Sequence, residues 1–138
     1  MNLEAIGMSG HSFGAITAQA DAKRAFANVQ LPWMLMTGTK DEAPIGNATA
    51  ASRREVFPLL PAGHKYELVL DGAEHSVFTD SSLPGDRGER NPHHHPAIEA
   101  LSTAFFDSYL REDKAAQGWL DGAGPRSILD PADQWQRK

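Results

Sequence analysis

The chain has 138 residues, no cysteine and a net charge of −5, and its acidic and basic residues are mixed along its length. This length fits one domain, the lack of cysteine excludes disulfide bonds and thiolate zinc sites, and the lack of a basic stripe argues against a nucleic-acid partner. No stretch reaches the roughly 20 apolar residues of a membrane span, and no signal-peptide pattern opens the chain, so localisation is left open.

The first predicted unit is a strand, a tight turn and a helix. A strand is expected over residues 5–9, whose first four residues are an apolar stretch, directly before Gly10-His11-Ser12-Phe13-Gly14, and a helix is expected over residues 13–27. A serine flanked by glycines two residues away on either side is typical of a nucleophile elbow, where glycine lets strand and helix approach closely. The alternative is a serine that only caps the helix.

Two further strands are predicted along the chain. Residues 31–37 form a near-continuous apolar run, as expected for a parallel strand covered on both faces. A turn at residues 39–42 and a helix at about 48–57, ended by Pro58, follow it. Residues 66–70 show an alternation of apolar and polar side chains and are rich in strand formers. This pattern predicts a strand that ends at Asp71-Gly72.

The last third of the chain is predicted to be mainly helical. Residues 76–95 are expected to be an irregular loop, and Pro96 to open a helix whose apolar stripe recurs every three or four residues. A short helix at about 114–120 follows, and residues 122–138 are expected to be a tail without periodicity. The chain thus divides into a domain, residues 1–121, and this tail.

Strands that alternate with helices predict an α/β fold with a mainly parallel sheet of about three strands. Ser12, Asp41 and His75 each follow one of these strands, so all three are expected at the carboxyl edge of the sheet. A serine hydroxyl becomes nucleophilic when an imidazole accepts its proton, and a carboxylate holds the imidazole in the required tautomer. The sequence therefore predicts a catalytic triad in the order serine, aspartate, histidine.

These motifs resemble the C-terminal half of the α/β-hydrolases, close to the esterases similar to dienelactone hydrolase and platelet-activating-factor acetylhydrolase. The matching segments are residues 10–14, 36–41 and 72–75, and residues 105–120 resemble the closing helices. The resemblance implies a carboxylic-ester hydrolase with Ser12 as nucleophile, His75 as general base, Asp41 as orienting acid and the backbone N–H of Phe13 as an oxyanion donor. It implies a small-molecule ester substrate and no cofactor or metal.

The chain also departs from the pattern of that family. About four strands normally precede the elbow, and the loop after the third supplies a second oxyanion donor; neither is found in this sequence. Only 28 residues separate Ser12 from Asp41, enough for one helix and one strand where the family usually has two strands. We therefore expect a partial α/β-hydrolase fold that lacks the N-terminal strands.

Several alternatives stay open at this point. Glu42 is a rival for the role of Asp41, and a thioesterase or acyltransferase would carry the same three residues. A non-catalytic fragment or interaction module would keep the motifs without an assembled site. His93-His94-His95 invites a metal hypothesis, but consecutive histidines do not share one face of a helix or strand.

A central strand without its upstream neighbours leaves unpaired backbone groups along one edge of the sheet. We therefore predict that the isolated chain self-associates through this edge. Sedimentation velocity tests the prediction, and a monodisperse monomer that unfolds cooperatively would contradict it.

Overall fold

The computed structural model describes residues 26, 28–42, 48–83, 85–86 and 88–138. In this part of the chain, three strands, β1 (Trp33–Lys40), β2 (Lys65–Glu74) and β3 (Gln134–Arg137), form one sheet in the order β1-β2-β3. β1 and β2 are parallel, whereas β2 and β3 are antiparallel. The α/β class is confirmed, but the sheet is mixed rather than mainly parallel. The predicted strand at residues 5–9 and the elbow lie outside the described residues.

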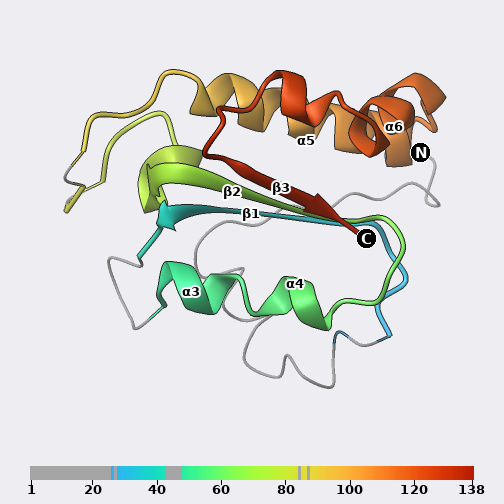
Figure 1. Ribbon diagram of the computed structural model, residues 1–138, viewed down its shortest axis with the longest axis horizontal. Coiled ribbons are helices and arrows are strands. Elements are labelled where there is room, and N and C mark those ends of the chain that lie inside the picture. Colours follow the sequence, from blue (N-terminus) through green and yellow to red (C-terminus); the bar gives the residue numbers. More distant parts are fainter. Residues whose placement is uncertain (1–25, 27, 43–47, 84, 87) are drawn as a thin grey trace.

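Helices cover both faces of the sheet (Figure 1). The helices α3 (Ala50–Arg53) and α4 (Val56–Leu59) lie on one face, and α5 (His94–Leu110) and α6 (Lys114–Asp121) lie on the other. Two short 3₁₀ segments, η1 (His75–Phe78) and η2 (Pro125–Ser127), complete the described elements. None of the described helices is both long and apolar enough to cross a membrane.

Two helix boundaries differ from the prediction because proline is tolerated in a first turn. The single helix expected over residues 48–57 is two short helices, and Pro58 lies inside the second rather than after its end. Likewise, α5 begins at His94, so Pro96 is its third residue. The first backbone N–H groups of a helix have no partner within the helix, so proline removes no hydrogen bond at these positions.

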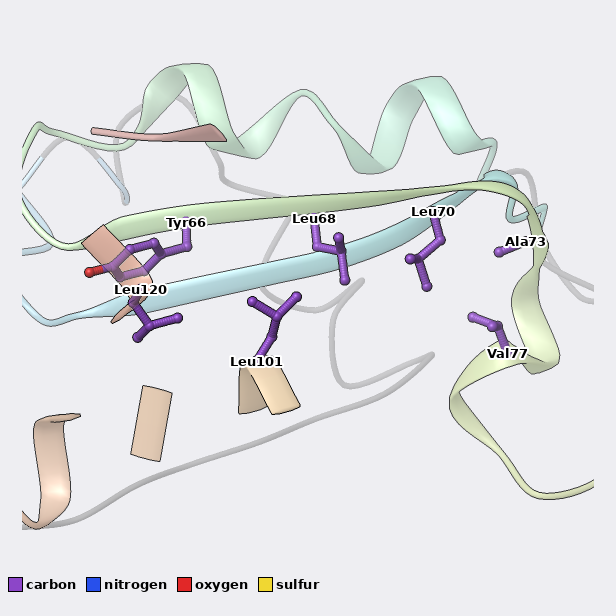
Figure 2. Close-up of a cluster of buried hydrophobic side chains, with 7 residues drawn as sticks. All are labelled: Tyr66, Leu68, Leu70, Ala73, Val77, Leu101 and Leu120. Atoms are coloured by element: carbon purple, nitrogen blue, oxygen red, sulfur yellow. The ribbon is translucent and has the colours of Figure 1, made fainter. Parts of the chain in front are cut away.

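The alternation of side chains along β1 and β2 builds two separate cores. Tyr66, Leu68 and Leu70 of β2 pack with Leu101 and Leu120 on the side of α5 and α6 (Figure 2). On the other face, Trp33 and Leu35 of β1 pack against a buried cluster with residues of α4 and the segments beside it. The members of that cluster are Phe26, Val56, Phe57 and Leu60. The sheet is thus buried on both sides, as the apolar run in β1 predicts.

The C-terminal segment, residues 122–138, adds a strand to the sheet, although no strand was expected there. Trp135 of β3 stacks on Tyr66, with ring centroids 5.5 Å apart. The Asp133 carboxylate is buried and accepts a hydrogen bond from the backbone N–H of Asp71 at 2.7 Å. Backbone hydrogen bonds of 3.0 Å also join Lys138 and Lys65 in both directions. The segment is therefore packed against the sheet.

At their carboxyl ends, β1 and β2 approach each other unusually closely. The regular pairing shifts between Gly38 and Lys40, and a Cβ atom added to Gly38 would lie 2.1 Å from the backbone oxygen of Ala73. No side chain fits in this space, so glycine is required at position 38. This contact fixes how the residues just beyond the two strand ends face each other.

The Gly38→Ala variant is predicted to lose about 1–3 kcal/mol of unfolding free energy, because the new methyl group forces the strand ends apart. Gly118→Ala is the matched control. Gly118 lies within α6 with nothing within 4 Å of an added Cβ, so alanine should stabilise the protein by up to about 1 kcal/mol. Urea unfolding of both variants measures the difference, and equal stability would contradict the role given to Gly38.

Candidate active site

Asp41 lies one residue beyond β1 in a tight turn. Its backbone N–H donates to the carbonyl of Gly38 at 3.2 Å, and its side chain is buried, with the residue only 2% exposed. The hydroxyl of Thr37, also buried, donates to Asp41 Oδ2 at 2.9 Å. A buried carboxylate needs such donors to offset the loss of hydration. The turn and Thr37 therefore hold the Asp41 carboxylate in one orientation.

His75 lies one residue beyond β2, where η1 begins, and it is also buried. Its Nδ1 atom is 2.7 Å from Asp41 Oδ1. Because β1 and β2 are parallel neighbours, their carboxyl ends lie at the same edge of the sheet. The structure thus brings together two of the residues predicted from sequence.

This contact determines where the imidazole proton lies. A carboxylate oxygen can only accept a hydrogen bond, so Nδ1 of His75 carries the hydrogen. In the neutral ring, Nε2 then holds the lone pair and is the atom able to accept a proton. This tautomer is the one that a histidine general base requires.

A third side chain, Arg53, joins the pair from the end of α3. Its Nε atom lies 3.1 Å from Asp41 Oδ1 and donates to the backbone oxygen of Asp41, also at 3.1 Å. Its Nη2 atom lies 3.4 Å from His75 Nδ1. The side chain of Arg53 is 8% exposed, so all three groups form one buried cluster.

The other predicted site residues have different positions. Ser12 and Phe13 lie outside the described residues, so their relation to His75 stays a prediction. Glu42, the rival of Asp41, is exposed, and its backbone N–H donates to the carbonyl of Lys40 at 2.9 Å. Of the two neighbouring carboxylates, Asp41 is the one in contact with His75.

A cavity of about 500 Å³ lies between the end of β2, the loop after η1 and the start of α5. Glu74 and Ser76, the chain neighbours of His75, line it together with Lys40, Asp86 and Arg90. This volume is within the range of small-molecule sites. Most of the lining residues are polar or charged, and neither Asp41 nor His75 is among them.

The three consecutive histidines do not converge on one point. His93 Nδ1 lies 3.0 Å from Asp130 Oδ1, and His95 Nε2 lies 3.1 Å from Arg90 Nη2. His94 is buried. Over the described ranges, no group of three or more histidine, aspartate or glutamate side chains is arranged to hold a metal ion.

Comparison of the chain with protein-family models, with curated proteins and with solved structures found no match.

Two members of the buried cluster were not predicted from the sequence. Thr37 belongs to the apolar run of β1, where a threonine is an ordinary strand former. Arg53 lies at the end of a short helix, and no motif distinguishes it from its neighbour Arg54. The fold alone brings both side chains to Asp41.

Burial lowers the pKa of His94 from its ordinary value of 6.5. The unfolded chain therefore binds a proton at this position at a higher pH than the folded chain does. As pH falls below about 6.5, the unfolded state gains protons first and the unfolding free energy decreases.

We predict that His94→Gln removes part of this acid sensitivity. Urea unfolding at pH 7.5 and at pH 5 should give a smaller loss of stability in the variant than in the wild type, whatever their difference at pH 7.5. An equal loss in both proteins would contradict the prediction.

Proposed function

We propose that this protein is a serine hydrolase that cleaves carboxylic esters. The observation that carries the proposal is the buried contact of 2.7 Å between His75 Nδ1 and Asp41 Oδ1 at the carboxyl ends of two parallel strands. A buried aspartate that fixes the tautomer of a histidine is the support that a serine nucleophile needs. The Gly-x-Ser-x-Gly motif at residues 10–14 supplies the candidate nucleophile.

In the proposed reaction, Ser12 Oγ attacks the ester carbonyl while His75 Nε2 accepts the hydroxyl proton. Asp41 holds the ring and stabilises the imidazolium that forms. The backbone N–H of Phe13 donates to the oxyanion, and His75 returns the proton to the leaving alcohol. Water then attacks the acyl-serine by the same route and releases the acid.

We further propose that the fold is a partial α/β-hydrolase fold. The parallel pair β1-β2, with an acid and a histidine directly after its strands, agrees with the chain order of that superfamily.

A fluorophosphonate probe tests the nucleophile, because it forms a covalent bond with an activated serine. Intact-mass analysis should show one adduct on the wild type and none on Ser12→Ala. A folded wild type that takes up no probe would contradict the proposal and favour a non-catalytic fragment.

Asp41→Asn tests the role of Asp41, and a substitution of the exposed neighbour Glu42 is the matched control. Asp41→Asn should lower turnover of p-nitrophenyl acetate by about 10⁴-fold, the cost of losing the orienting acid in a serine protease. Glu42→Gln should leave turnover unchanged. Comparable rates for Asp41→Asn and the wild type would remove Asp41 from the mechanism.

A further inference from the structure

Arg53 contacts both members of the aspartate–histidine pair. Its Nε atom is 3.1 Å from Asp41 Oδ1 and its Nη2 atom is 3.4 Å from His75 Nδ1. Few arginine side chains are as buried as this one, at 8% exposure, and a buried guanidinium needs an anionic partner. Asp41 is that partner as well as the partner of His75.

The contact between Arg53 Nη2 and His75 Nδ1 is not a hydrogen bond. A guanidinium only donates, and Nδ1 already carries the hydrogen that points to Asp41. The contact instead sets a positive charge beside the ring. Arg53 therefore attracts the carboxylate and repels the protonated form of the imidazole.

We infer that Arg53 is a positioning residue of this site that also sets how readily His75 becomes protonated. Its relevance to catalysis rests on the proposed function, but its effect on the ring does not. The positive charge of Arg53 and the negative charge of Asp41 cancel. The cluster of the three side chains is therefore neutral when His75 is neutral and carries one positive charge when His75 is protonated. Without Arg53, protonation of His75 would neutralise Asp41 instead.

Several charged groups lie near His75 among the described residues, and Lys40, Asp86 and Arg90 line the cavity next to its chain neighbours Glu74 and Ser76. Asp41 contacts the ring from the end of β1 and Arg53 from α3, and Glu74 precedes His75 at the end of β2. Arg53 brings its Nη2 atom within 3.4 Å of the ring nitrogen. Its charge favours return of the proton to the leaving group, the second half of each proposed transfer.

The test follows the His75 imidazole by ¹⁵N NMR across a pH titration, with the signal assigned through His75→Gln. In Arg53→Gln, the titration midpoint should move to higher pH by about 1 unit or more, because a nearby positive charge has been removed. Arg54→Gln is the matched control. Arg54 is more exposed and bonds Gln134 and Glu67 instead, so its midpoint should equal that of the wild type. A folded Arg53→Gln with an unchanged midpoint overturns the inference.

Arg53→Lys tests the positioning role even if Arg53→Gln does not fold. Lysine keeps the charge but cannot reproduce the guanidinium fork, so the midpoint should stay near that of the wild type while the low-field Nδ1–H signal exchanges faster. A lysine variant with an Nδ1–H signal as protected as in the wild type would overturn the positioning role.

The NMR titration does not depend on catalytic turnover. The proposal that the protein is a hydrolase and the proposal for Arg53 can therefore be rejected independently of each other. A shifted midpoint without fluorophosphonate labelling of Ser12 would reject the hydrolase and keep the role of Arg53. Labelling of Ser12 together with an unchanged midpoint would support the hydrolase and reject the role of Arg53. If both hold, the acid limb of the pH–rate profile for ester hydrolysis should move to higher pH in Arg53→Gln.

Discussion

The site depends on the close approach of two strand ends. Gly38 lies against the backbone of Ala73 with no room for a side chain, and the regular pairing of β1 and β2 shifts just beyond it. Asp41 lies three residues after Gly38, and His75 lies two residues after Ala73. Their side chains come within 2.7 Å of each other, between His75 Nδ1 and Asp41 Oδ1. A wider spacing at Gly38 would separate the only two predicted triad members that the described residues include.

The neighbours of the buried Asp41–His75 pair supply the hydrogen bonds and positive charge that a buried carboxylate needs. Asp41 lies out of solvent, where an unpaired carboxylate is costly. Thr37 donates to one of its oxygens, and His75 and Arg53 approach the other. Because these donors come from β1, the start of η1 and α3, the carboxylate depends on the packing of α3 against the sheet. The orientation of His75 is thus a property of the whole fold.

The sequence predicts the parts of the molecule that depend on local patterns. The apolar run of β1 and the alternation in β2 reveal two buried strands, and residues that follow such strands are known to meet at one edge. Asp41 and His75 were therefore found from their positions along the chain. Ser12 was identified from the Gly-x-Ser-x-Gly motif, and it lies outside the described residues.

Other features could not be read from the sequence because they depend on tertiary contacts. β3 has only four residues, and one apolar side chain, Trp135, gives no alternating pattern; its pairing comes from the packing on Tyr66 and the anchor at Asp133. The prolines at 58 and 96 suggested helix boundaries, yet both lie within first turns. Arg53 carries no local signal, since only the fold brings it to Asp41.

We propose that the buried Asp41–His75 pair activates Ser12, and a crystal structure of the protein after reaction with a fluorophosphonate would show whether it does. We expect phosphorus bonded to Ser12 Oγ, His75 Nε2 within hydrogen-bond distance of the adduct, and Asp41 still hydrogen-bonded to His75 Nδ1. An adduct on another residue, or on Ser12 but remote from His75, would contradict it.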